Sequence, residues 1–180
     1  MRALATVCLL ASFAVSVPGA DGVSARSKTV RIIVNGKSDW RIVCPPPGSP
    51  RIDSAARELQ RCLQQSSGCK LPIVQRVRRK PALAIGLRPE LSPDDRAVLP
   101  PPAPGQDAYA VAVVPATRKT TARIVIAGNN PHGVVCGVRD VLERLGCRSP
   151  SSAEDAKAMS AMRQDTILLP AGSWAVASPK

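Results

Sequence analysis

The sequence predicts an α+β fold, a two-layer domain in which a mixed β-sheet of about six strands carries two amphipathic helices on one face. Two observations lead to this prediction. The segments 49–68 and 130–146 repeat apolar residues at helical spacing between capping and terminating residues. The other apolar runs are short, rich in Val, Ile and Ala, and bounded by turn residues, which is typical of strands.

The N-terminus has the pattern of an export signal. Arg2 precedes an apolar run, 3–17, that is too short to span a bilayer. We expect a signal peptide within residues 1–25, cleaved between Gly19 and Ala25, and a secreted or periplasmic protein. An N-terminal apolar strand is the alternative. No later segment is long and apolar enough to suggest a membrane span.

The folded domain is predicted over residues 28–148. Its first strand, 28–35, ends in the turn signal Asn35-Gly36, and a second strand, 39–44, is stopped by three prolines. We expect these two strands to pair as a loosened hairpin.

The first helix is predicted to begin with Ser49 as its cap and Pro50 in its first position. Gly68 is expected to end it. Its apolar residues form one stripe: Ile52, Ala55, Ala56, Leu59 and Leu63.

Two further strands are predicted at 71–77 and 82–86, followed by a proline-rich loop, 89–105. Within that loop, Ser92 precedes the adjacent carboxylates Asp94 and Asp95. Adjacent carboxylates can indicate catalysis, but acids at the start of a short helix also interact favourably with its dipole. We favour the capping interpretation.

The clearest strands, 107–114 and 122–127, lead into the second helix. Asn130 is its predicted cap and Gly146 its end. Gly133 and Gly137 lie four residues apart at one edge of its apolar stripe. A glycine inside a helix costs about 1 kcal/mol, so we expect close approach of this helix to the sheet.

Residues 149–180 are predicted to form a mobile connection and a C-terminal tail. A short strand is possible within that tail, at 166–169, with Trp174 packed beside it.

No nucleotide, metal or other cofactor is expected. The segment 128–133 lacks both the dinucleotide fingerprint and the P-loop lysine. The single histidine, His132, has no nucleophile in a recognisable elbow nearby. One histidine without C-x-x-C spacing makes a zinc site improbable.

Five cysteines remain if Cys8 leaves with the signal. We predict a disulfide between Cys62 and Cys69, which requires the first helix to end before Gly68. The alternative is that Cys62 packs as a small apolar residue while Cys69 stays free.

The formal net charge of +12, from 25 Lys+Arg against 13 Asp+Glu, favours anionic partners. A sequence with one Tyr, two Trp and one Phe, the last inside the signal, offers few rings on which nucleic-acid bases could stack. No nucleic-acid partner is expected. The remaining choice is between a solvated basic surface and a patch that binds anions. The candidate patch consists of Arg76, Arg78, Arg79 and Lys80.

Three segments together resemble the N-terminal accessory domain of secreted glycoside hydrolases. They are "SPRIDSAARELQRCLQQSSGCKLPIV", "PALAIGLRPEL" and "ARIVIAGNNPHGVVCGVRDVLERLGCR". The resemblance is to the domain that precedes the catalytic barrel in alpha-glucuronidases and chitobiase-type beta-N-acetylhexosaminidases. It implies a two-layer α+β fold and a non-catalytic role, with a catalytic domain or a polysaccharide as partner. A barrel needs about 250 residues, and about thirty follow Arg148.

Three functions therefore compete. An accessory domain would pack against a hydrolase or present a sugar-facing surface, with only Trp40, Tyr109 and Trp174 as aromatic platforms. A self-contained glycosidase would need two carboxylates about 5–10 Å apart, and the candidate close pairs are Asp94/Asp95 and Asp140/Glu143. A basic module would bind acidic glycans or envelope polymers.

Overall fold

The structure is a computed structural model and describes residues 29–46, 48–147 and 164–178. The predicted signal peptide, 1–25, and the connection 149–163 lie outside these ranges. The elements, in chain order, are β1 (Thr29–Ile33), β2 (Arg41–Val43), α1 (Pro50–Ser67), β3 (Ile73–Val74), β4 (Ala82–Leu87), η1 (Arg88–Glu90), α2 (Pro93–Ala97), β5 (Tyr109–Val114), β6 (Arg123–Gly128), α3 (Pro131–Arg144), β7 (Ile167–Pro170) and β8 (Gly172–Val176).

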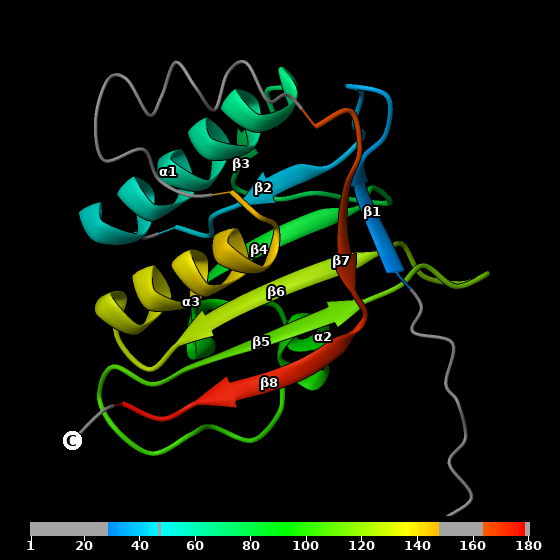
Figure 1. Cartoon of the computed structure of the whole chain (residues 1–180). Helices are drawn as coiled ribbons and strands as arrows, with labels where there is room; N and C mark the ends of the chain where they lie inside the picture. Colours follow the sequence, from blue (N-terminus) through cyan, green and yellow to red (C-terminus); the bar gives the residue numbers. More distant parts are fainter. Residues whose placement is uncertain (1–28, 47, 148–163, 179–180) are drawn as a thin grey trace, which may run out of the picture.

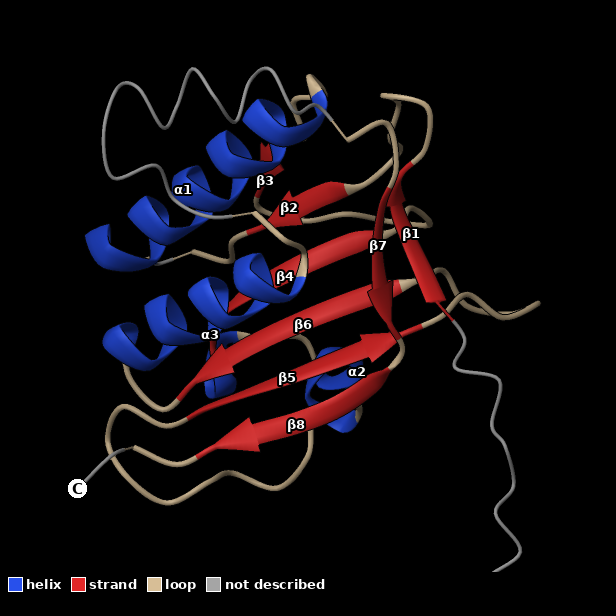
Figure 2. Cartoon of the chain, in the orientation of Figure 1, coloured by secondary structure: helices blue, strands red, loops and turns tan. Residues whose placement is uncertain are grey.

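A six-stranded mixed sheet forms the centre of the domain, in the order β3-β2-β4-β6-β5-β8. Strands β3, β2, β4 and β6 are parallel, while β5 and β8 are each antiparallel to their neighbours. Helices α1 and α3 lie side by side on one face of this sheet, and α2 lies on the opposite side (Figure 1, Figure 2). The predicted α+β class and the two-helix layer are confirmed.

The central strands β4, β5 and β6 are buried on both faces, and the two faces differ in side-chain size. The helical face, which carries α1 and α3, presents large buried residues from the three central strands: Leu83, Ile85, Val111, Val113, Ile124 and Ile126. The loop face is covered by η1, α2 and the proline-rich loop. It presents smaller residues from the same strands: Ala84, Ala110, Ala112, Val125 and Ala127.

The predicted hairpin between the first two strands is wrong. Strand β1 pairs with β7, whereas β2 pairs in parallel with β3 and β4. The predicted turn does form, since Asn35 and Gly36 have φ angles of 51° and 68° and Val34 bridges Lys37. The chain then diverges, and β2 enters the main sheet.

Two side chains of the segment between β1 and β2 donate to β1. Ser38 Oγ donates to the Ile32 carbonyl at 2.6 Å, and Trp40 Nε1 donates to the Arg31 carbonyl at 2.9 Å. Side chains rather than backbone amides of this segment therefore bond to these carbonyls, while β2 joins the main sheet.

The predicted starts of both helices and the predicted end of the first helix are confirmed. Ser49 Oγ accepts from the Ile52 amide at 3.3 Å, and Asn130 Oδ1 accepts from the Gly133 amide at 2.7 Å. Gly68 ends α1 in the left-handed region, with φ 78°. Of the helices in the described ranges, none is long and apolar enough to cross a membrane.

The predicted Cys62–Cys69 disulfide is not formed, and none links the cysteines of the described ranges. Helix α1 does end before Gly68, at Ser67, so the stated requirement is met and the disulfide is nevertheless absent. Cys62 is fully buried among core residues, while Cys69 lies at the edge of the core.

The close approach predicted from the two helix glycines is confirmed. A Cβ added at Gly133 would lie 2.6 Å from the Ala108 carbonyl oxygen. One added at Gly137 would lie 2.8 Å from the Ile126 side chain. Helix α3 can lie this close to β5 and β6 only without those Cβ atoms.

The description of 149–180 as a connection and tail needs correction over its described part. Strand β7 confirms the expected strand near 166–169, but it pairs with β1. Strand β8 was not expected, and it completes the main sheet beside β5. Trp174 belongs to β8 and contacts α3, where its Nε1 donates to Asp140 Oδ2 at 2.6 Å. The domain therefore extends beyond residue 148.

Candidate ligand-binding site

A pocket of about 480 Å³ opens on the loop face of the sheet. We call it the loop-face pocket. Its floor includes Ala82 and Ala84 of β4, with Val43 of β2 beside them. One wall is the segment that follows β3, residues 75–78, and the other consists of residues 90–95 together with Arg123. Small floor residues leave the room that larger ones would fill.

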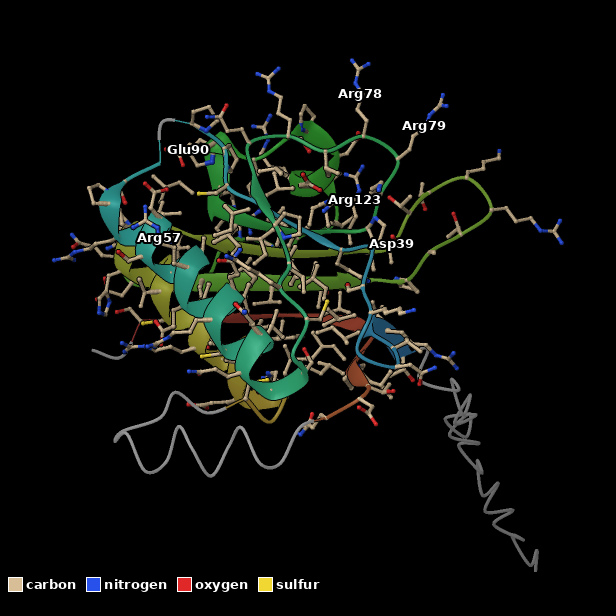
Figure 3. All side chains as sticks on the ribbon, turned by 90° about the horizontal axis from the view of Figure 1, so that it is seen from above. Asp39, Arg57, Arg78, Arg79, Glu90 and Arg123 are labelled. Atoms are coloured by element: carbon tan, nitrogen blue, oxygen red, sulfur yellow. The ribbon has the colours of Figure 1, made fainter. Side chains whose placement is uncertain are left out.

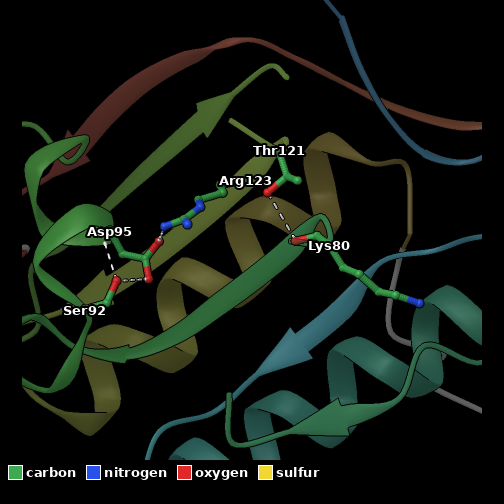
Figure 4. Close-up of polar contacts among 5 residues, drawn as sticks. All are labelled: Lys80, Ser92, Asp95, Thr121 and Arg123. Carbon is green, nitrogen blue, oxygen red and sulfur yellow. Dashed lines mark hydrogen bonds and ion pairs between the residues drawn. The ribbon is translucent and has the colours of Figure 1, made fainter. Parts of the chain in front are cut away.

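The acidic wall is built around the cap of α2. Ser92 Oγ accepts from the Asp95 amide at 3.2 Å and donates to Asp95 Oδ2 at 2.5 Å (Figure 4). Arg123 Nη1 lies 2.8 Å from Asp95 Oδ1, and the Asp95 side chain is only 14% exposed. The capping interpretation of this acidic pair is confirmed for Asp95, whose two oxygens are both engaged.

The other carboxylates of this wall differ in their contacts. Glu90 Oε2 accepts from the Leu87 amide at 3.3 Å. Asp94 is exposed at the pocket and makes no hydrogen bond or ion pair with any residue of the described ranges. Asp94 is therefore the carboxylate of this wall that is available to a ligand.

The structure divides the predicted basic patch into two pairs. Arg76 and Arg78 line the loop-face pocket, whereas Arg79 and Lys80 do not. All four residues are exposed. Arg79 has a φ of 54°, and the Lys80 carbonyl accepts from Thr121 Oγ1 at 3.3 Å. Figure 3 shows Arg78 and Arg79 extending away from the ribbon, with Arg123 closer to the body of the domain.

The second carboxylate pair has a structural role. Asp140 accepts from Trp174 Nε1 and from Arg144 Nε, the latter at 2.9 Å. The Arg144 guanidinium also lies 4.1 Å from the centre of the Trp174 ring, within cation–π range. These contacts fasten β8 to α3, while Glu143 is exposed on the helix surface.

His132 does not form a catalytic relay. Its Nδ1 lies 3.5 Å from Asp107 Oδ1 and 3.7 Å from Cys136 Sγ. In a nucleophile–base–acid relay the two partners contact opposite ring nitrogens. Here the same nitrogen meets both, and the His132 side chain is 53% exposed.

The three aromatic residues of the described ranges do not line the loop-face pocket. Trp40 is buried, and Tyr109 and Trp174 are half-buried on the helical face. Burial, with Asp140 nearby, raises the pKa of Tyr109 to about 12. A ligand in the pocket would therefore be held by charge and hydrogen bonds rather than by ring stacking. In the described ranges no three His, Cys, Asp or Glu side chains are placed to hold a metal ion.

Sequence reasoning identified the basic run but missed the pocket. Residues 75–78 and 90–95 meet there because β3 lies beyond β2 and the chain then returns to β4 on the other side. No local sequence signal reports that crossing. One sequence feature could have indicated the pocket: in β4, Ala82 and Ala84 alternate with larger residues, which predicts one face with little side-chain volume.

The chain is similar in fold to part of larger glycoside hydrolases. Over 82% of its length it matches 18% of BtGH115A, a family GH115 4-O-methyl-alpha-glucuronidase with specificity for decorated arabinogalactans, with a TM-score of 0.57 and 16% identity. It also matches, over 82% of its length and 23% of the other chain, a mutant Streptomyces plicatus beta-hexosaminidase in complex with GlcNAc, with a TM-score of 0.47 and 16% identity. No family model and no curated protein matches the chain.

These matches concern the fold. The chain spans about a fifth of the length of the first of these enzymes. The resemblance noted from the sequence is confirmed at this level, since the GH115 enzyme contains the same helix-on-sheet arrangement.

Proposed function

We propose that this protein is a non-catalytic accessory domain of the glycoside-hydrolase type, associated with polysaccharide degradation outside the cytoplasm. One observation carries the proposal: the two-layer fold matches a segment of a much larger GH115 enzyme. Fold alone does not fix function, so the chemistry of the described carboxylates provides the second support.

In each close carboxylate pair noted from the sequence, one member is engaged by other side chains. Asp95 is held by the cap and by Arg123, and Asp140 is held by Trp174 and Arg144. A glycosidase requires one carboxyl group that gives a proton and a second that acts as base or nucleophile. Carboxylates fixed by an ion pair and a cap are poorly suited to either role.

The test is a hydrolysis assay with the purified full chain. We expect no turnover of aryl glucuronides or aryl N-acetylglucosaminides. Turnover that disappears in Asp94→Asn or Asp140→Asn would show a self-contained hydrolase and overturn the proposal. Turnover that survives both substitutions would also contradict the proposal if it co-purifies with the chain, and would indicate a contaminating enzyme if further purification removes it.

A second candidate is a basic module for acidic glycans or envelope polymers. Four exposed cations in one short segment, Arg76, Arg78, Arg79 and Lys80, favour it. Binding of this kind weakens steeply with salt. Retention on an acidic polysaccharide resin that is unaffected by salt would argue against it.

A further inference from the structure

We propose that the loop-face pocket binds a small hydroxyl-bearing carboxylate, the uronic acid unit of an acidic saccharide, with Arg76 and Arg78 on the anionic group and Asp94 on a hydroxyl group. This inference deepens the proposed binding role and rests on it. It assigns the ligand to one pocket rather than to the whole basic patch.

Two of the three arginines that line the pocket have no ion-pair partner within the described ranges. Arg123 has its carboxylate, Asp95, at 2.8 Å. Arg76 and Arg78 lie on the same pocket and form no ion pair with a described residue. Guanidinium groups bind carboxylates through two parallel hydrogen bonds. Both residues line the pocket, so an anionic group bound there can pair with them.

The opposite wall limits what else can enter. Glu90, Asp94 and Asp95 face the same cavity, and only Asp95 is ion-paired there. A ligand that is negative along its whole length would be repelled by this wall. A ligand with one anionic end and neutral hydroxyl groups would give Arg76 and Arg78 the anion and give Asp94 a hydrogen-bond donor.

The size and the floor agree with a ligand of one or two sugar units. The cavity of about 480 Å³ lies within the range usual for small-molecule sites, roughly 300–1,000 Å³. Its lining also contains the apolar residues Pro45, Pro46 and Leu91 besides the alanines of the floor. Such a surface suits the C–H face of a pyranose ring.

The division of the patch supplies a matched test. Arg76→Ala/Arg78→Ala and Arg79→Ala/Lys80→Ala each remove two positive charges from the same exposed segment. Binding of a glucuronic-acid-containing disaccharide to the full chain is measured by calorimetry or NMR titration. We expect the first double variant to weaken binding about tenfold or more, since a charge-assisted bond contributes about 1.5–3 kcal/mol. The second should change binding by less than about threefold, through general electrostatics.

Two further probes separate the possible sources of the anion. The methyl ester of the same disaccharide should bind weakly or not at all. A sulfated polysaccharide should bind Asp94→Asn more tightly than the parent chain, whereas the uronic acid disaccharide should bind it less tightly. Equal losses in the two double variants, or no detectable binding of the disaccharide, would overturn the inference. These outcomes are distinct from failure of the accessory role, which the hydrolysis assay reports.

Discussion

The two faces of the central strands of the sheet are both buried, but by side chains of different size. On the helical face, branched residues such as Leu83 and Ile126 interlock with α1 and α3. On the loop face, alanines such as Ala84 and Ala112 meet a short helix and a proline-rich loop. Strands buried on both faces lack the apolar–polar alternation of half-exposed strands. The period of two survives here as an alternation of large and small residues.

This difference assigns most of the stability to the helical face and the ligand-binding pocket to the loop face. Burying a large aliphatic side chain contributes about 1.5–3 kcal/mol, so most of the hydrophobic stabilisation comes from the helical face. The loop face contributes less, and its small residues leave a pocket. Four predictions follow this division.

The largest effect is expected for truncation on the helical face. Leu83→Ala should reduce the free energy of unfolding by about 2–5 kcal/mol, because Leu83 is fully buried between the sheet and the helices. Leu99→Ala, the same change on the loop face, should cost clearly less, since Leu99 is 9% exposed and its loop can collapse around the smaller side chain. Chemical denaturation of both variants measures the contrast, and equal losses would contradict it.

Overpacking of the helix–sheet contact should come next. Gly137→Leu places a side chain where even a Cβ would lie 2.8 Å from Ile126, and such overpacking costs about 1–3 kcal/mol. Glu143→Leu, on the exposed surface of the same helix, is the control. An unchanged denaturation midpoint for Gly137→Leu would show that α3 is not pressed against the sheet.

Alkaline pH should reduce the stability of the domain. Burial, together with a hydrogen bond to Asp53, raises the pKa of Cys44 from 9.0 to about 11. Above pH 9 the unfolded chain loses this proton before the folded one does, so stability falls as pH rises from 9 to 11, by at most about 3 kcal/mol. Cys44→Ala should flatten the fall in this window. A pH dependence identical to that of the parent would exclude Cys44 as its source.

The smallest effect is expected from the helix caps, which compare the two faces directly. Ser49→Ala removes the cap of α1 and should cost about 1 kcal/mol of global stability. Ser92→Ala removes the cap of the five-residue α2, which is largely exposed, and should mainly increase local opening. Hydrogen exchange at the Asp95 amide and the denaturation midpoint distinguish the two responses. A larger midpoint shift for Ser92→Ala would reverse this ranking.

Features with a local cause could be predicted from the sequence. The caps Ser49 and Asn130, and the terminator Gly68, act on groups three or four residues away, so the sequence contains the whole interaction. The close contact between α3 and the sheet could also be predicted. Gly133 and Gly137 lower the stability of a helix, so their presence required a packing explanation, and the structure provides it.

Features with a non-local cause could not be predicted. The turn at Asn35-Gly36 was identified correctly, but β1 pairs with β7, which lies far away in the sequence. Strand β8 was missed because its sequence, "GSWAV", gains its strand character from the register with β5. The pocket needed the sheet order, which brings together two segments separated along the chain.

The pairing of β1 with β7 has a consequence for how the protein is made. Strand β1 is completed early in translation, yet its partner includes residues up to Pro170. Until those residues leave the ribosome, β1 has no strand to pair with, and β5 likewise waits for β8 to cover its outer edge. Pairing between strands so distant in sequence folds slowly. The nascent chain therefore presents two open strand edges, which a chaperone or an early partner could protect until synthesis is finished.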